Sequence, residues 1–259
     1  MRLSGGGRAL ERLAGAARGG PGAPAAPRRW RTVRSGPDPW SRVGEVGDQT
    51  WLRGRGPALV REALQQTLLF PTARAIARPR VEGAAELMHA PQPAVLAPNH
   101  ASDIDTPLIL GALPYAWRAR TVVGAASERF YRRRGYALMS GFWINTFPFD
   151  RSGELRGLAG AAALLREGHN VLLYPQATRS AGQVDGLRTG VARLSIATGV
   201  PLVPVYVGGT ALIMPKNRGL TQRGRATVRF GRPLHPGAGE APLELMERTR
   251  AAIAALASS

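Results

Sequence analysis

The chain has 259 residues, of which 44% are hydrophobic, enough to form a packed core and to exclude a wholly disordered protein. It contains no cysteine, which excludes disulfide bonds, thiolate catalysis and cysteine-ligated zinc. The formal net charge is +18, so the surface attracts polyanions: nucleic acid, an anionic membrane leaflet or acidic substrates. Charge alone does not choose among these three classes of partner.

Residues 1–56 are basic, rich in glycine and proline, and show no regular spacing of apolar residues. This composition predicts a disordered basic arm. The arm lacks the apolar core of a secretory signal, and although it is similar in composition to an organelle transit peptide, its glycine, proline and alanine favour a disordered tail. The tail is interpreted either as solvated or as a tether to anionic lipid, with Trp30, Trp40 and Trp51 at the interface.

Residues 57–259 are predicted to form the folded domain, which opens with an amphipathic helix over 57–80. Apolar residues such as Leu59 and Val60 fall near one helical face, and Pro71 is expected to interrupt or kink the helix. Two interpretations stay open: a helix packed on the core, or a membrane-docking helix that lies in a bilayer surface. No run of about 18 apolar residues occurs, so a conventional spanning helix is not expected.

From residue 81 to about 235, short apolar strands alternate with helices. The alternation predicts an α/β fold with a mixed, largely parallel sheet covered by helices. Glycines at 168 and 199 stand where a helix is expected to end. The predicted strands cover residues 94–97, 120–124, 171–174, 202–207 and 226–230, with an aromatic-rich strand or strand–loop at 141–149. The predicted helices cover residues 106–113, 155–167, 191–198 and 243–256.

The loop after the 94–97 strand reads Pro-Asn-His-Ala-Ser-Asp-Ile-Asp over residues 98–105. Such a loop can fold the Asp105 carboxylate back onto one nitrogen of His100, which leaves the other nitrogen to accept a hydroxyl proton. The pair has no protein nucleophile, so the attacking oxygen must belong to the substrate. Taken alone, His-x4-Asp arises often by chance, and a histidine near a strand end is usually structural.

Two further segments place an arginine just past an apolar strand, beside small hydroxyl residues. They read Phe-Pro-Phe-Asp-Arg-Ser over 147–152 and Tyr-Pro-Gln-Ala-Thr-Arg-Ser over 174–180. Arg151 and Arg179 are therefore candidates for bidentate bonds to phosphate, although each alone is equally well a solvated surface charge. The segment 200–205, an apolar strand bracketed by prolines, reads chiefly as a core strand.

In this order, the four blocks closely resemble the glycerolipid acyltransferase family that includes 1-acylglycerol-3-phosphate acyltransferase. The family's blocks read N-H-x4-D, a Phe-rich segment ending in Arg, F-P-E-G-T-R-S, and V-P-V. Residues 185–190 also resemble the family's F-K-x-G segment, and residues 205–210 match what usually follows the fourth block. The resemblance covers about residues 60–235.

The resemblance implies an enzyme that moves a fatty acyl group from acyl-CoA or acyl-carrier protein to the free hydroxyl of lysophosphatidate, giving phosphatidate. His100 would be the general base and Asp105 its orienting partner. No metal or bound cofactor is expected, and the partners would be the lyso-phospholipid, the acyl donor and an anionic membrane surface. The protein would be peripheral on the cytoplasmic face of the membrane. The residues expected to bind substrate are Arg151, Gln176, Thr178, Arg179, Ser180 and Arg188.

Two departures from the family's blocks bear on the acceptor. Gln176-Ala177 stands where the family has Glu-Gly, which removes a negative charge, and Leu187-Arg188 stands where Phe-Lys is usual. The alternatives are an acyltransferase for a different lyso-lipid or polar acceptor, or a non-catalytic homologue that binds lipid surfaces. Specific nucleic-acid binding is not expected, because the arginines are dispersed and no recognised nucleic-acid fold signature is found.

Overall fold

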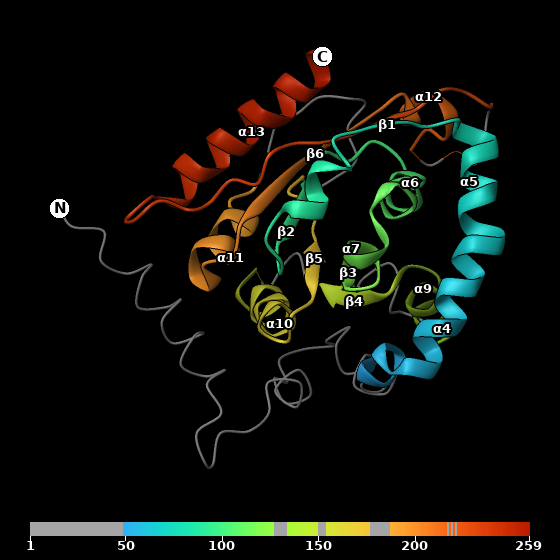
Figure 1. Cartoon of the computed structure of the whole chain (residues 1–259), viewed down its shortest axis with the longest axis horizontal. Helices are drawn as coiled ribbons and strands as arrows, with labels where there is room; N and C mark the ends of the chain where they lie inside the picture. The colour runs from blue at the N-terminus through green and yellow to red at the C-terminus, as the bar shows by residue number, and fades with distance from the viewer. Residues whose placement is uncertain are drawn as a thin grey trace.

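The computed structural model describes residues 49–126, 134–149, 154–176, 187–216, 218, 220 and 222–259 (Figure 1). Most of the predicted basic arm, residues 1–48, lies outside these ranges. The boundary predicted at residue 56 is too late, because η1 covers Gln49–Arg53 and α4 begins at Arg55. Leu52 of η1 is fully buried, so an apolar anchor inside the predicted arm belongs to the folded domain.

A seven-stranded sheet in the order β1-β7-β6-β2-β5-β3-β4 forms the centre of the fold. All neighbouring strands run parallel except β6 and β7, which confirms the predicted mixed, largely parallel sheet. The strands are β1 (Arg80–Glu82), β2 (Val95–Pro98), β3 (Thr121–Ala126), β4 (Thr146–Phe149), β5 (Asn170–Leu172), β6 (Leu202–Gly208) and β7 (Thr227–Phe230).

Helices cover both faces of this sheet (Figure 1). Side chains alternate between the two sides, so Leu96 of β2 joins one core cluster while Val95 and Ala97 join the other. One face packs on α5 (Phe70–Ala77), α6 (Asp105–Ala112) and α7 (Tyr115–Arg118), and the other on α10 (Glu154–Arg166), α11 (Gly190–Thr198) and α13 (Pro242–Ser258). The chain also forms the short helices η3 (Glu86–His89) and α12 (Thr210–Ile213) and the longer helix α9 (Arg134–Ile144).

The aromatic-rich stretch over 141–149, predicted as a strand or strand–loop, is partly helical. Residues 141–144 are the end of α9, and β4 starts at Thr146. Asn145 makes the turn with φ of 52°, held by a bond from its Nδ2 to the Thr121 carbonyl at 2.9 Å. An apolar run without clear periodicity does not distinguish a buried helix end from a buried strand, which explains the error.

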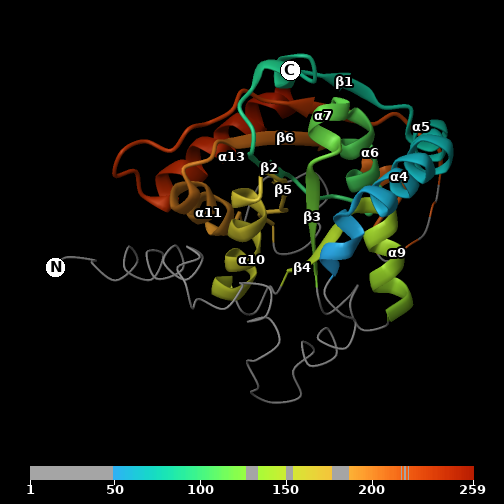
Figure 2. The same ribbon diagram turned by 60° about the horizontal axis from the view of Figure 1, so that its bottom comes forward.

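The segment α4 (Arg55–Leu64), η2 (Gln65–Leu69) and α5 forms one continuous helical rod along an edge of the molecule (Figures 1 and 2). The interruption or kink predicted at Pro71 takes another form, because η2 is a π-helical turn that directly precedes α5. Pro71 then falls in the first turn of α5, where its missing N–H is tolerated. The rod buries Phe70 and Ala77 but leaves Leu59, Val60 and Leu68 exposed. None of the helices within the described ranges is long and apolar enough to cross a bilayer.

The sheet places three loops at one edge. Strands β6, β2 and β5 are neighbours and run parallel, so their carboxyl ends meet. His100 follows β2, Tyr174 follows β5, and α12 follows β6. Ligand sites of open α/β sheets form at such an edge, because loops there project from a rigid scaffold.

Candidate active site

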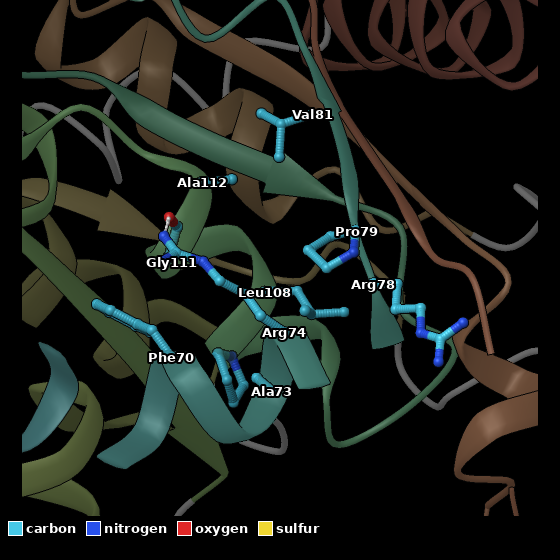
Figure 3. A pocket seen from close by; sticks show the side chains of 10 residues that line it. Phe70, Ala73, Arg74, Arg78, Pro79, Val81, Leu108, Gly111 and Ala112 are labelled. Atoms are coloured by element: carbon cyan, nitrogen blue, oxygen red, sulfur yellow. Dashed lines mark hydrogen bonds between the residues drawn. The ribbon is translucent and has the colours of Figure 1, made fainter. Parts of the chain in front are cut away.

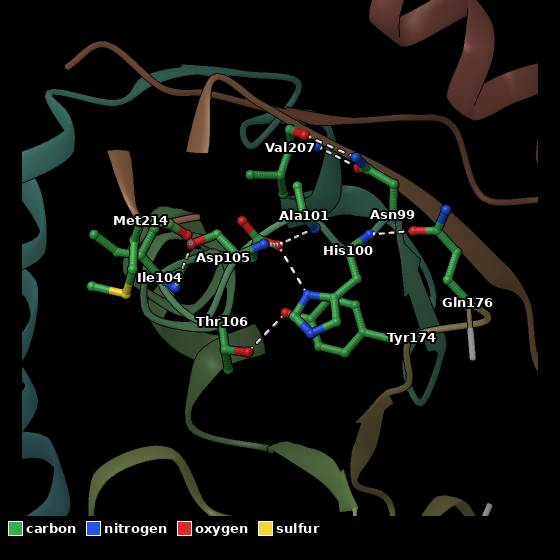
Figure 4. Close-up of polar contacts among 11 residues, drawn as sticks. Asn99, His100, Ala101, Ile104, Asp105, Thr106, Tyr174, Gln176, Val207 and Met214 are labelled. Atoms are coloured by element: carbon green, nitrogen blue, oxygen red, sulfur yellow. Dashed lines mark hydrogen bonds and ion pairs between the residues drawn. The ribbon is translucent and has the colours of Figure 1, made fainter. Parts of the chain in front are cut away.

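His100 and Asp105 meet as the sequence predicts (Figure 4). The Nδ1 atom of His100 lies 2.9 Å from Oδ2 of Asp105. The histidine side chain is 12% exposed and the aspartate side chain is fully buried. A carboxylate partner at Nδ1 favours the tautomer with its proton on that nitrogen, which leaves Nε2 as an acceptor. The arrangement leaves Nε2 able to accept a proton from a hydroxyl group.

The Asp105 carboxylate is fixed by the backbone around it. Its Oδ2 also accepts bonds from the N–H groups of Ala101 and Ser102, both at 2.8 Å. Asp105 is the first residue of α6, where the helix dipole favours a negative charge. A carboxylate held by two backbone N–H groups cannot swing away from the imidazole, so its charge stays where an imidazolium would form.

Tyr174 covers one face of the imidazole ring. The two ring centroids are 3.9 Å apart with an angle of 29° between the planes, which is a stacked arrangement (Figure 4). The Tyr174 hydroxyl lies 2.7 Å from Oγ1 of Thr106, the residue that follows Asp105 on α6. Burial, together with the charge of Asp105, raises the pKa of Tyr174 well above its usual value, so its hydroxyl stays protonated. No local pattern predicts a role for Tyr174 or Thr106, because their contact joins distant parts of the chain.

Gln176 holds the backbone of the histidine. Its Oε1 accepts the His100 N–H at 2.6 Å, and its side chain is buried. The substrate-binding role predicted for Gln176 stays a prediction, and the structure adds a contact of its carbonyl oxygen with the His100 loop. The position needs an acceptor for this contact, which an amide supplies as well as a carboxylate does.

Two further contacts tie the loop to β6 and α12. Asn99 accepts the Val207 N–H at 2.7 Å and donates to the Val207 carbonyl at 2.9 Å, so its amide pairs like a strand residue. The Ser102 hydroxyl donates to the Met214 carbonyl at 2.7 Å. The loop is thus attached to the sheet edge at its start and to the end of α12 near its middle.

Of the five remaining residues predicted to bind substrate, the structure describes Arg188. Arg188 is exposed, and its N–H bonds to the Pro175 carbonyl at 2.9 Å, next to the isolated bridge between Gln176 and Leu187. The other four lie outside the described residues: Arg151, Thr178, Arg179 and Ser180. Their roles stay predictions, as does the expectation that no metal or bound cofactor takes part.

A histidine oriented by a buried carboxylate, at the carboxyl edge of a largely parallel sheet, is an arrangement in an α/β protein that suits proton transfer. The family model described as Acyltransferase matches residues 78–208, just over half of the chain. The chain belongs to this acyltransferase family.

Curated relatives carry more specific names. The chain is 28% identical over 159 residues to the chloroplastic 1-acyl-sn-glycerol-3-phosphate acyltransferase LPAT1 of Arabidopsis thaliana, covering 60% of this chain and 43% of that protein. It is 27% identical over 159 residues to the chloroplastic BAT2 of Brassica napus, covering 60% of this chain and 44% of that protein. The matches therefore span less than half the length of these curated relatives.

A solved structure shares the fold. The 1-acyl-sn-glycerophosphate (LPA) acyltransferase PlsC from Thermotoga maritima matches with a TM-score of 0.54 and 22% identity. The match covers 80% of this chain and 89% of that chain. At this identity the likeness establishes the fold, and it agrees with the helix-covered, largely parallel sheet described above.

Proposed function

We propose that this protein is a 1-acylglycerol-3-phosphate acyltransferase that transfers a fatty acyl group from a thioester to the free hydroxyl of lysophosphatidate. The 2.9 Å contact between His100 Nδ1 and the buried Asp105 carboxylate carries this proposal, because it prepares Nε2 to accept a hydroxyl proton. Membership of the acyltransferase family and the names of the curated relatives support the same activity.

The reaction needs one base and one anion site. Nε2 of His100 removes the proton from the lysophosphatidate hydroxyl as its oxygen attacks the thioester carbonyl carbon. A C–O ester bond forms and the C–S bond breaks, and the imidazolium then returns its proton to the leaving thiolate, giving a free thiol. The buried Asp105 charge stabilises the imidazolium between these two steps.

The acceptor phosphate would be held by guanidinium groups near the His100 loop. Arg151 comes two residues after the end of β4, and Arg179 comes three residues after Gln176. We assign both to the phosphate, with Thr178 and Ser180 as hydroxyl donors and the exposed Arg188 beside them. Planar guanidinium groups suit the bidentate recognition of phosphate oxygens.

The helical rod would dock the enzyme on the membrane as a peripheral protein, on the cytoplasmic face. Leu59 on α4 is 71% exposed, and Val60 and Leu68 are also exposed, so the rod presents apolar side chains to the outside. A helix of this kind lies in the interface with its apolar side buried among the lipid head groups. A lyso-lipid could then reach the site without leaving the bilayer surface entirely.

The neutral residue at position 176 does not argue against catalysis. Its oxygen supports the His100 backbone at 2.6 Å, a function that requires no charge. The departure from the family's Glu-Gly pair bears on the acceptor, so a different lyso-lipid is the second candidate substrate. A panel of lyso-lipids with phosphate, amine and sugar head groups, each tested with one donor, separates these acceptors.

The decisive experiment is turnover by the purified full chain with labelled acyl-CoA and lysophosphatidate, followed by identification of the product. We expect phosphatidate from the wild-type protein and no product above background from His100→Ala. Asp103→Asn is the matched control, because Asp103 is exposed in the same loop, and it should keep near wild-type turnover. If His100→Ala turns over as fast as wild type, the proposed chemistry is wrong.

The acyl donor is settled by the same assay. Parallel reactions with acyl-CoA and with an acylated carrier protein, at matched chain length, give two values of kcat/KM. A donor preference of more than tenfold would assign the physiological thioester.

A further inference from the structure

The C-terminal end of the helical rod is joined to a distant part of the chain. The Gly224 N–H bonds to the Ile76 carbonyl at 3.0 Å, and the Ala226 N–H bonds to the Ala77 carbonyl at 2.7 Å. Helix α12 also packs against α5, as Figure 1 shows. Residues after β6 therefore lie against the end of the rod, although they follow it by more than 100 positions in the sequence.

A second group of exposed apolar and basic side chains lies at this junction. We name it the second surface, and it is separate from the apolar side chains of the rod itself. Within the described residues, none of its basic side chains forms an ion pair with a carboxylate. The members are Arg78, Leu212, Lys216, Leu220, Arg223 and Arg225.

A cavity of about 390 Å³ lies where the rod meets β1 and α6 (Figure 3). Its walls are largely apolar, with Phe70 and Leu108 among them, and Arg74 and Arg78 supply the only basic groups of its lining. Arg78 thus belongs both to this lining and to the second surface. This cavity lies next to the junction, and its volume is on the scale of a lipid ligand. Its two arginines carry the positive charge that suits a phosphate head group.

One rod alone would not fix the orientation of the enzyme on a membrane. From Leu59 to Arg78 the rod spans roughly 30 Å at about 1.5 Å per residue. A rod on a plane makes a line of contact, so the body could still roll about that line. A second contact away from the line would stop the rolling, and Leu212 and Leu220 come from a segment outside the rod.

The second surface is also connected to the catalytic loop. Met214, two residues after Leu212, accepts the bond from the Ser102 hydroxyl at 2.7 Å. Ser102 in turn donates its N–H to the Asp105 carboxylate that orients His100. Placing this segment on a membrane would therefore set the height of His100 above the lipid head groups.

We propose that the second surface is a second membrane contact, in which Leu212 and Leu220 insert at the interface and the arginines bind anionic phospholipid head groups. The inference rests on the proposed function, because it assumes that the acceptor is a bilayer lipid. The combination of exposed leucines with basic side chains favours a lipid surface. An acidic carrier protein would be attracted by the same charges, and the experiment distinguishes it.

The test compares two double variants of the full chain, Leu212→Ser with Leu220→Ser, and Arg223→Gln with Arg225→Gln. The matched controls are Leu243→Ser and Arg166→Gln. Leu243 is 63% exposed against 70% for Leu212, and it lies on α13, at the opposite side of the molecule from α5 (Figure 1). Arg166 is exposed at the end of α10, on the other face of the sheet. Binding is measured by sedimentation with vesicles of phosphatidylcholine alone or mixed with phosphatidylglycerol.

Loss of the two arginines should weaken binding to the anionic vesicles roughly 30-fold and leave binding to neutral vesicles unchanged. Loss of the two leucines should weaken binding to both kinds of vesicle about tenfold. Turnover of vesicle-bound lysophosphatidate should fall with binding, whereas turnover of a short-chain acceptor dissolved as a monomer should match wild type. That last measurement also shows that the variants are folded.

Vesicle binding equal to that of the controls would overturn the proposal. So would a loss of turnover confined to reactions with acyl-carrier protein, which would assign the second surface to a protein partner. If wild type turns over no acceptor at all, the proposed function fails separately, and the vesicle comparison still decides the role of the second surface.

Discussion

The catalytic loop and the helical rod are attached to the body of the protein in different ways. In the loop, three acceptors fix the backbone and ring of His100 and its neighbours: Asp105 Oδ2, Gln176 Oε1 and the Met214 carbonyl. The C-terminal part of the rod is buried through Phe70 and Ala77, whereas its N-terminal part is attached largely through long polar side chains. Arg118 pairs with Glu62 of α4 at 2.6 Å and its guanidinium lies over the ring of Phe70, 5.4 Å from the centroid.

The difference follows from what each region is proposed to do. Proton transfer needs groups held within a fraction of an ångström, which short buried bonds to backbone atoms provide. A membrane-docking helix must keep apolar side chains outside, so the N-terminal part of the rod leaves Leu59 and Val60 exposed and relies on a few polar anchors. Four predictions, taken from the largest expected effect to the smallest, test whether this contrast is real.

Asp105→Asn should lower kcat about 10³- to 10⁴-fold with little change in stability. The amide oxygen can still accept the N–H groups of Ala101 and Ser102, but no negative charge remains to stabilise the imidazolium. Single-turnover rates with saturating lysophosphatidate measure the effect. A loss of less than tenfold would mean that the carboxylate is structural only.

Gln176→Ala should lower kcat about 100-fold, because the buried His100 N–H loses its acceptor and the loop shifts. Gln176→Glu keeps an acceptor and should retain most of the activity. Its added negative charge beside the His100 backbone should raise the pKa seen on the acid side of the kcat/KM profile. An unchanged profile for Gln176→Glu would show that this side chain does not influence His100.

Tyr174→Phe should reduce kcat a few-fold with KM nearly unchanged, since the ring still stacks on the imidazole but its tie to Thr106 is lost. Thr106→Val should give a similar loss, Thr106→Ser should restore activity, and the double variant should be no worse than either single one. Additive losses would show that the two hydroxyls act separately.

Glu62→Gln tests the rod and should cost about 1 kcal/mol of stability at neutral pH. Burial alone would raise the pKa of Glu62, but hydrogen bonds from Arg118 and Gln66 outweigh it and hold the pKa below its ordinary value of 4.5. The stabilisation is therefore present above about pH 4.5 and is lost as the pH falls through the lower folded pKa.

Urea denaturation at neutral and acidic pH measures the Glu62 contribution, and wild type and variant should converge in acid. Glu247→Gln is the control, because its ion pair with Arg250 is exposed and should matter little. A constant gap between wild type and Glu62→Gln at all pH values would contradict the role of this pair.

The sequence predicted the features that depend on local pattern. The strand before His100, the helix after Asp105 and the helix endings at Gly168 and Gly199 are all confirmed, with positive φ at both glycines. The pairing of His100 with Asp105 was predictable because only five positions separate them. Short loops limit the number of arrangements, so spacing carries structural information there.

The sequence did not predict the features that depend on tertiary contact. Tyr174 and Gln176 reach His100 from the end of another strand, so no local pattern signals their contacts. The family's third block has phenylalanine at the position of Tyr174, and this departure was the sequence signal that could have indicated a role for Tyr174. Strand β1 was missed because it has three residues, of which Arg80 and Glu82 are charged, at the sheet edge.

The two hydrogen bonds between the Asn99 side chain and the Val207 backbone have a consequence for the ageing of the protein. The primary amide of Asn99 donates one hydrogen bond and accepts another, whereas a carboxylate can only accept. Spontaneous hydrolysis of the Asn99 amide to aspartate would set an oxygen against the Val207 carbonyl and repel it. A single deamidation would then weaken the attachment of the catalytic loop to β6, so activity would fall slowly as the protein ages.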